Sequence, residues 1–187
     1  AVMGENPSYS QSPDLPVEQV SWDDVQVFLA RINAQIPGLA LSLPSEAQWE
    51  YACRAGTTTP FSFGGNITPE QVNYDGRFPY ANGSKGLYRQ KTVPVASLPP
   101  NSWGLFEMHG NVYEWCEDIW HASYQEAPTD GRAWIDAQSA LDSGVERVVR
   151  GGSWIDGARD VRAAFRLADS PDVRYHDLGF RCSRVHS

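Results

Sequence analysis

The feature that most constrains the fold is the stretch from Gly56 to Pro100, which shows little helix or strand periodicity. Gly, Pro, Asn and Thr recur along it with scattered aromatic residues. Irregular segments of this length inside a compact domain are usually functional, or are held in place by ions and side-chain networks. No linker or internal repeat interrupts the chain, so the sequence predicts one α+β domain rich in loops.

Two amphipathic helices are predicted before the irregular stretch, and both are expected to pack on a sheet. Ser21 with Asp24 is typical of an N-cap, and a capping box at Ser45 with Gln48 begins the second helix. The first helix ends at Pro37-Gly38 and carries an apolar stripe formed by Trp22, Val25, Phe28, Leu29 and Ile32. The candidate strands are Thr92 to Ala96, Val112 to Trp115, Arg147 to Arg150 and Gly179 to Arg184.

Composition excludes several classes of function. The chain of 187 residues is 41% hydrophobic, yet no apolar run approaches the length of a membrane span, so no membrane insertion by this segment is expected. The net charge is −8, and only 15 residues are Lys or Arg. A general nucleic-acid binder needs cations against phosphates, so no nucleic-acid partner is expected. The expected partner is a protein or a small-molecule ligand.

The cysteines and histidines do not predict a metal site. Cys53, Cys116 and Cys182 match no zinc spacing, and one thiol is left over if two of them pair. Cysteine usage therefore leaves the redox compartment open. No two histidines have a metal-ligand spacing such as i,i+4 on a helix; the four are His109, His121, His176 and His186.

Six sequence blocks, in order, carry a resemblance to a known family. They read "LPVEQVSWDDVQVF", "LPSEAQWEYACRAG", "VNYDG", "TVPVASLPPNSWGLFEMHGNVYEWCED", "RVVRGGSW" and "DLGFRC". Over nearly its whole length the chain resembles the formylglycine-generating enzyme family, also called the sulfatase-modifying-factor domain. The resemblance implies a C-type-lectin-like fold with low regular secondary structure, formed by residues 1–187 as a single domain. A family strand and helix start normally precede Ala1, so the domain is expected to be N-terminally truncated.

The resemblance also bears on catalysis. Catalytic members look like copper-dependent oxidases, in which two cysteines five positions apart supply the soft thiolates that Cu(I) prefers. The corresponding stretch, "IDGARDVRAAFR" at residues 155–166, contains no cysteine. Aligning the arginines puts Ala158 and Ala163 at the two thiolate positions. We therefore expect no copper and no formylglycine-generating activity, and we assign no catalytic residue.

The resemblance gives the cysteines a structural role. It implies that Cys53 and Cys182 form a structural pair with adjacent sulfurs, bonded or not according to compartment. Cys116 is then the lone thiol and is expected to be a buried filler of the core. The location is not determined by the sequence, with a cell-surface, periplasmic or secreted one favoured.

The segment "GNVYEWCED", residues 110–118, resembles a family calcium site. Carried over, the ligands are the Glu107 side chain, the Gly110 and Val112 carbonyls and the Glu114 side chain. In an extended segment, alternate positions can direct oxygens the same way, and Ca²⁺ takes six to eight oxygens. The alternative is that Glu114 bonds nearby backbone amides and Asn111 caps a turn. A second family site would begin at Asn73 and Tyr74, but no acidic partner follows near residues 87–89.

The C-terminal third is expected to carry the ligand face. By resemblance, a frame of arginines and the "GFR" of Gly179 to Arg181 alternates with side chains that the family pattern does not specify. The candidate ligand-binding residues are Trp154, Ile155, Asp156, Asp160, Val161, Phe165, Leu167, Asp169, Tyr175 and His176.

Two classes of function follow. The first is a non-catalytic binding module on a calcium-stiffened lectin-type scaffold, of which one form is a variable protein of a diversity-generating retroelement. The alternative is a copper-independent tailoring enzyme of the same family, oxidoreductase-like, with Asp156 or Asp160 as acid or base. A purely structural interpretation also stands, in which the arginines only tie irregular loops together.

Overall fold

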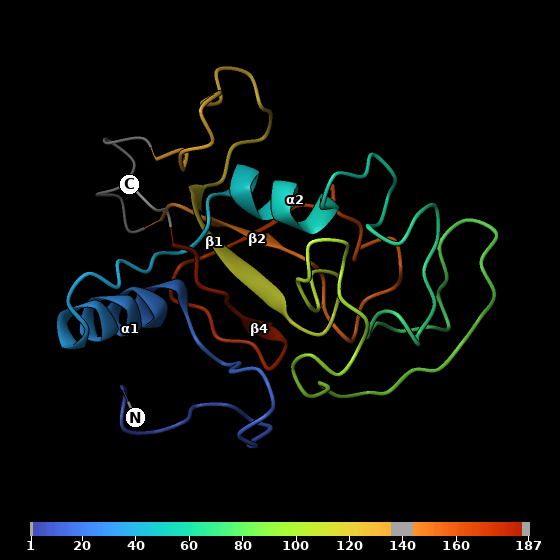
Figure 1. The fold of residues 1–187 in the computed structure, drawn as a ribbon, viewed down its shortest axis with the longest axis horizontal. Helices are drawn as coiled ribbons and strands as arrows, with labels where there is room; N and C mark the ends of the chain where they lie inside the picture. The colour runs from blue at the N-terminus through green and yellow to red at the C-terminus, as the bar shows by residue number, and fades with distance from the viewer. Residues whose placement is uncertain (1, 136–143, 185–187) are drawn as a thin grey trace.

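The computed structural model describes residues 2–135 and 144–184, in which two helices and a four-stranded sheet carry the regular structure (Figure 1). The helices are α1 (Trp22–Gln35) and α2 (Glu46–Arg54). The strands are β1 (Tyr113–Ile119), β2 (Arg147–Arg150), β3 (Leu167–Asp169) and β4 (Leu178–Gly179). Irregular chain between α2 and β1 fills much of the right-hand half of Figure 1, as the predicted loop-rich α+β architecture requires.

Both predicted helices are confirmed, and both begin with a capping box. The Ser21 hydroxyl accepts from the Asp24 amide at 3.1 Å, and the Asp24 carboxylate accepts from the Ser21 amide at 3.0 Å. Ser45 and Gln48 repeat the arrangement at α2. These reciprocal bonds satisfy amides that would otherwise lack a partner in the first turn. Ala55 then ends α2 in the left-handed conformation, with φ of 46°.

The sheet has the strand order β3-β2-β1-β4. β1 pairs antiparallel with β2 and parallel with β4, while β3 extends the other edge antiparallel to β2. The register between β1 and β2 shifts between Trp115 and Ile119, which is an irregularity of the bulge type. The predicted strand Arg147 to Arg150 is confirmed at its exact bounds. The strand predicted from Val112 begins one residue later and continues to Ile119.

Two of the strand expectations need correction. Thr92 to Ala96 is not a strand, because the amide of Asn111 takes the place of a partner strand and bonds both the N–H and the carbonyl of Val93. Pro94 has no N–H to continue a ladder. Regular pairing near the C-terminus is also shorter than expected, since β4 covers only Leu178–Gly179 and Ser183 forms an isolated bridge with Ser42.

The two helices cover opposite faces of the sheet. Val25 and Leu29 of α1 share one apolar cluster with Trp115 and Val149, whereas the cluster under α2 contains their strand neighbours Cys116 and Val148. Successive side chains of a strand point to opposite faces, so adjacent residues belong to separate clusters. The sheet is therefore buried on both sides, which explains why all four residues of β2 are buried.

The long irregular stretch has an apolar cluster of its own. Four of its side chains pack against Ala158 and Val161 from the C-terminal third, and they are Phe61, Ile67, Val72 and Tyr74. Burial of these side chains fixes a segment that has little backbone hydrogen bonding of the regular kind. It also places the stretch beside the residues predicted to form the ligand face.

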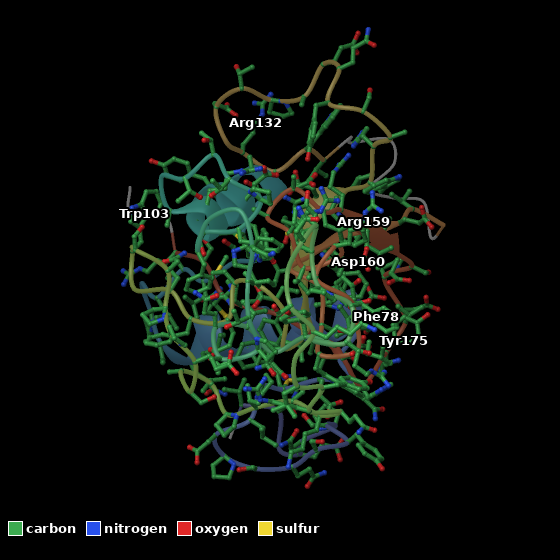
Figure 2. All side chains as sticks on the ribbon, turned by 90° about the vertical axis from the view of Figure 1, so that its right-hand side faces the viewer. Phe78, Trp103, Arg132, Arg159, Asp160 and Tyr175 are labelled. Carbon is green, nitrogen blue, oxygen red and sulfur yellow. The ribbon has the colours of Figure 1, made fainter. Side chains whose placement is uncertain are left out.

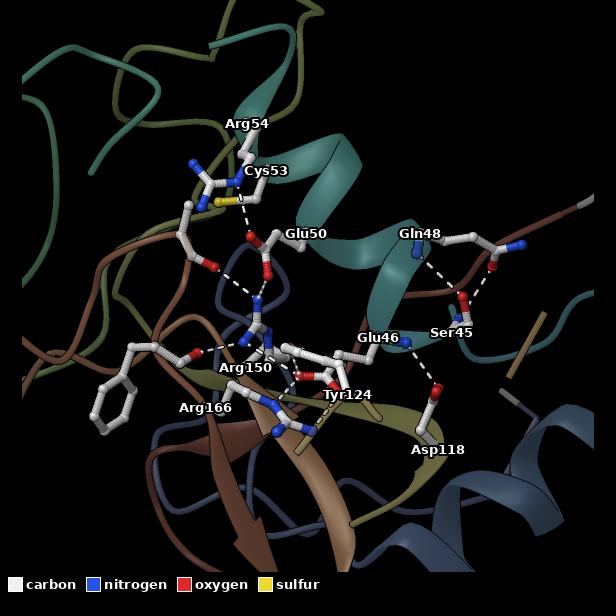
Figure 3. Close-up of polar contacts among 12 residues, drawn as sticks. Ser45, Glu46, Gln48, Glu50, Cys53, Arg54, Asp118, Tyr124, Arg150 and Arg166 are labelled. Carbon is white, nitrogen blue, oxygen red and sulfur yellow. Dashed lines mark hydrogen bonds and ion pairs between the residues drawn. The ribbon is translucent and has the colours of Figure 1, made fainter. Parts of the chain in front are cut away.

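A buried network of charges joins α2 to the segment that follows β2 (Figure 3). The fully buried Arg150 side chain pairs with Glu50, lies 3.3 Å from Glu46, and donates to the Ala163 and Phe165 carbonyls. Arg166 forms two bonds of 2.6 and 2.7 Å with the Glu46 carboxylate. The arginines predicted to be frame residues thus include one that anchors the C-terminal segment to α2.

Candidate functional site

The predicted calcium turn is built around a close approach of two backbones. Gly110 has φ of 71°, and a Cβ there would lie 2.3 Å from the Asn73 carbonyl oxygen. Its N–H donates to Gly151, and the next amide, of Asn111, donates to Asn73, both at 2.9 Å. Only glycine fits this position without strain. The turn therefore joins the irregular stretch to the residues after β2.

Both predicted carboxylate ligands have partners. Glu107 accepts from the backbone amides of Ala96 at 2.9 Å and Leu98 at 3.3 Å. Glu114 accepts two bonds of 2.5 and 2.6 Å from Arg181, and its Oε2 also accepts from the indole N–H of Trp49 at 2.6 Å. The alternative role for Glu114, bonding to backbone amides, is not what the structure shows.

In its chemistry the donor set suits a hard cation, because Ca²⁺ takes carboxylate and carbonyl oxygens. Glu107, Val112 and Glu114 line one cavity of about 360 Å³, and each carboxylate oxygen can accept more than one bond. Arg181 lines the same cavity, so a Ca²⁺ ion would share the Glu114 carboxylate with its guanidinium. Asn73, expected in a second calcium site, donates to the Lys91 carbonyl and to Asn111 at 3.0 and 3.1 Å.

The two positions expected to hold copper thiolates are apolar and fully buried. Ala158 packs in the cluster of the irregular stretch, and Ala163 packs under α2 beside Cys53 and Cys116. Burial raises the pKa of both of these thiols, so both stay protonated at neutral pH. Cys116 is thus the buried filler that the sequence indicates.

Cys53 and Cys182 are not bonded to each other in the structure. The Cys53 sulfur lies in the core, 3.5 Å from the Met108 carbonyl and 3.6 Å from His109. Arg181 turns inward to Glu114, and in extended chain the next side chain turns outward. Cys182 is accordingly exposed, and both cysteines are free thiols; that their sulfurs lie adjacent, bonded or not, stays a prediction.

The histidines within the described residues have structural partners. Nδ1 of His109 lies 2.7 Å from the Val161 carbonyl and Nε2 accepts from the Ser62 amide at 3.1 Å, so the proton is on Nδ1. Burial lowers the pKa of His109 to about 4. His121 stacks on Trp134 with ring centroids 3.6 Å apart. In the parts of the chain that the structure describes, no three His, Cys, Asp or Glu side chains form a cluster able to hold a metal.

The predicted ligand-binding residues divide by burial. Ile155 and Tyr175 are 45% and 46% exposed, and Tyr175 lies on the face turned to the viewer in Figure 2, as does Asp160. Three apolar candidates belong instead to the core: Val161 is fully buried, and Phe165 and Leu167 pack against the cluster under α1. The solvent-reaching members form what we call the C-terminal face: Trp154, Ile155, Asp156, Asp160, Asp169, Tyr175 and His176.

Asp156 belongs to a cluster that the sequence did not reveal. The Ser153 hydroxyl lies 2.7 Å from Asp156 Oδ2 and 2.9 Å from Asp177 Oδ2. A hydroxyl has one proton to donate, so the second contact requires a proton on one of the two carboxyl groups. Burial raises the pKa of Asp156, and the charge of Asp177 adds to the effect. Asp156 can therefore hold a proton above the usual range of an aspartate.

A second group that the sequence did not indicate comes from the irregular stretch. Arg77 is bonded to Asp75 and lies 4.3 Å from the centroid of the Tyr88 ring, which in turn stacks on Trp154 at 6.2 Å. The backbone amide of Asp75 donates to the Asp156 carbonyl at 2.8 Å. Long-range contacts, to Trp154 and to Asp156, hold these residues against the C-terminal face, and no local sequence pattern marks such contacts.

Comparison with known proteins decides the family. The sulfatase-modifying factor enzyme 1-like domain matches residues 2–186 of the chain. The chain belongs to this family of formylglycine-generating enzyme-like domains. The formylglycine-generating enzyme of Bos taurus is 32% identical over 191 residues, covering 98% of this chain and 47% of that protein. The chain thus spans about half the length of the curated relatives it matches.

Solved structures of relatives confirm the fold of this formylglycine-generating enzyme-like domain, the C-type-lectin-like variant that the sequence predicts. PvdO from Pseudomonas aeruginosa is 34% identical, with a TM-score of 0.78 over 93% of this chain and 63% of that chain. Treponema denticola variable protein 1 is 29% identical, with a TM-score of 0.74 over 97% of this chain and 78% of that chain. No helix among the described residues is long and apolar enough to cross a membrane.

Proposed function

We propose that this formylglycine-generating enzyme-like domain is a non-catalytic binding module that presents its C-terminal face to a protein or small-molecule ligand. The observation that carries the proposal is the chemistry at Ala158 and Ala163. Both are fully buried methyl groups, and a methyl group offers Cu(I) no lone pair. The domain therefore keeps the family scaffold without the two thiolates that the resemblance places there.

The way the C-terminal segment is anchored supports this proposal. Arg166 is bonded to Glu46, Arg174 to Asp24 and Arg181 to Glu114, each by two hydrogen bonds. These three pairs fix the backbone on both helices and on β1, while Tyr175 between them and Ile155 before them remain exposed. A face of this kind can change its side chains at little cost to the fold. The similarity to Treponema denticola variable protein 1 supports a variable protein of a diversity-generating retroelement as one form of this module.

We also propose that Ca²⁺ stiffens the scaffold through Glu107, Gly110, Val112 and Glu114. Oxygen donors of these kinds are the ones that Ca²⁺ takes in proteins. Three of the four residues line one cavity. Gly110, the fourth, is the glycine at which the irregular stretch touches the turn before β1. An ion at this junction would hold the two segments together and add rigidity beneath the C-terminal face.

Catalysis and binding are tested separately. Incubation with copper and a sulfatase-type cysteine peptide is expected to give no formylglycine product by mass spectrometry, with a functional formylglycine-generating enzyme as the control. For binding, a photo-crosslinking amino acid at position 175 is expected to give specific adducts with cellular partners. The same amino acid at position 27, which is similarly exposed on α1, is expected to give none. Peptide turnover, or equal labelling from both positions, would refute the proposal.

The retroelement form has its own test in the source genome. A reverse transcriptase gene and a near-copy of the region encoding residues 155–177, differing at adenines, are expected beside the gene. A neighbouring biosynthetic operon without these elements favours the second candidate, a copper-independent tailoring enzyme. The observation that favours this enzyme is the Asp156 and Asp177 pair at Ser153, because a shared proton suits a general acid or base.

A further inference from the structure

A cavity of about 420 Å³ lies against the C-terminal face and takes its walls from three segments that are distant in sequence. Trp154 and His176 contribute the wall formed by the C-terminal third. The other two walls come from the N-terminal segment and from the end of the irregular stretch; they are Tyr9, Ser10, Gln19, Gln90, Lys91 and Thr92. None of these six residues is among the candidates that the sequence indicates.

Hydrogen bonds hold each of the three walls in place. The Ser10 amide donates to the buried Glu18 carboxylate at 2.7 Å, and the Gln19 amide donates to the Tyr175 carbonyl at 2.9 Å. Asn73 donates to the Lys91 carbonyl at 3.0 Å. Because each wall is held by groups outside the cavity, the shape of the cavity is already formed without a ligand. Binding would then cost little ordering of the protein.

Two features of the lining lower the stability of the folded protein when no ligand is bound. Gln19 and Gln90 both have left-handed backbone conformations, with φ of 57° and 60°, which glutamine rarely adopts. Thr92 is only 5% exposed, and its hydroxyl has no hydrogen-bond partner among the described residues. Strained residues and unpaired buried polar groups gather at binding sites, where a ligand supplies the missing contact.

The lining residues define the class of ligand. Among the described residues, no Asp or Glu lines the cavity and Lys91 is the one lining side chain with a permanent charge, so the walls neither attract cations nor bind dianions well. The lining includes two side-chain amides and three hydroxyls, groups that can both donate and accept hydrogen bonds. Trp154 adds an aromatic ring, held between Tyr88 at 6.2 Å and His176 at 5.5 Å. A sugar ring matches this set, since it has hydroxyls at its edge and an apolar C–H face.

We propose that this cavity binds a neutral carbohydrate, with one sugar ring against Trp154 and its hydroxyls bonded by Gln19 and Gln90. This inference rests on the proposed function, because it names the ligand class of the same binding module. It does not involve the candidate calcium residues, which line a different cavity. Carbohydrate binding is therefore expected to persist in EDTA.

The test is an NMR titration of the protein with D-glucose, D-galactose, D-mannose and N-acetyl-D-glucosamine, following the backbone amide signals of positions 19, 90 and 154, which the variants keep. At least one sugar is expected to give a saturable shift at up to about 10 mM, the range of weak single-ring binding. Loss of the aromatic ring in Trp154→Ala is expected to weaken binding about tenfold or more. Gln19→Ala and Gln90→Ala are expected to weaken it several-fold.

The matched controls are Trp103→Ala and Gln125→Ala, which alter two exposed residues outside the cavity. Trp103 is labelled at the left of Figure 2, across the molecule from Tyr175. Both are expected to bind the sugar as the unaltered protein does. The inference is overturned if no neutral sugar binds, if only the acidic N-acetylneuraminic acid binds, or if Trp103→Ala loses as much affinity as Trp154→Ala. Specific crosslinking of a partner at position 175 in the absence of sugar binding would remove this inference while leaving the proposed function standing.

Discussion

Asp156 shows how a single contact can couple the C-terminal face to pH. The groups that face its carboxyl are Ser153, Tyr113 and Asp177, and Asp160 lies close enough to act on Tyr113. Burial raises the pKa of Asp156, so folding favours the protonated form. The stability gained is present at low pH and is lost as the pH rises from the unfolded pKa of about 3.9 through the raised folded pKa.

Asp156→Asn removes this titration and keeps the shape of the side chain. The variant is expected to lose less stability than the unaltered protein between about pH 4 and pH 8, because asparagine holds no charge for Asp177 to repel. Urea unfolding at a series of pH values measures the difference. Asp14→Asn, at an exposed position, is the control and should leave the pH profile unchanged. A profile identical for Asp156→Asn and the unaltered protein would contradict the shared proton.

Replacing Gly110 is expected to lower the stability of the fold through backbone effects alone. Gly110→Ala would place a methyl group against the Asn73 carbonyl and force alanine to a φ of 71°. We expect a loss of roughly 2–4 kcal/mol of unfolding free energy, measured by chemical denaturation. Gly65→Ala is the matched control, since a Cβ there meets nothing within 4 Å. Equal losses in the two variants would show that the close approach does not matter.

At the scale of elements, α2 is held by charge as much as by apolar packing. Its inward face carries Glu46 and Glu50 as well as Trp49, and Arg150 of β2 satisfies both carboxylates (Figure 3). Arg150 also lies 5.3 Å from the centroid of the Trp49 ring. A charged helix face against a buried strand is stable only while the pairing is complete.

Arg150→Ala should therefore cost far more than an exposed arginine does. Truncation leaves Glu50 without its buried partner and frees the Ala163 and Phe165 carbonyls, for which we expect a loss of roughly 3–5 kcal/mol. Arg132→Ala, whose side chain is 74% exposed, should change stability by less than about 0.5 kcal/mol. Thermal and urea unfolding of the two variants provide the comparison. A loss below about 1 kcal/mol for Arg150→Ala would mean that the network contributes little.

How far the sequence predicts each element depends on the range of the contacts that form it. Capping at Ser21 and Ser45 is local, so both helices were predictable from a few neighbouring residues. β3 was not, because its three residues carry no periodicity and pair only with residues 147–149 of β2. Val161 could not be recognised as a core residue, because the cluster that buries it comes from residues 61–74. The carboxyl pair at Ser153 likewise depends on residues 24 positions apart.

At the scale of the whole molecule, Asn111 is one point at which the irregular stretch is joined to the segments around β1 and β2. Its side chain bonds Val93 and Asn73, and its carbonyl accepts from Trp154. The proposed calcium ligands flank this residue on both sides. Calcium at this junction would act on both halves together, so its removal should lower the stability of the whole domain.

Thermal unfolding with calcium and with EDTA tests this proposal. At one hundred times its Kd, a bound ion stabilises the folded state by about 2.7 kcal/mol, which corresponds to a rise in Tm of roughly 5–10 °C for a domain of this size. Glu107→Gln should remove most of this response, because the amide oxygen can still accept from Ala96 but carries no charge for the ion. Glu70→Gln, on the exposed surface, should retain it. An unchanged unfolding midpoint in EDTA would contradict the calcium proposal. Arg181, which donates two bonds to Glu114, would then be the cation that balances the charge of that carboxylate.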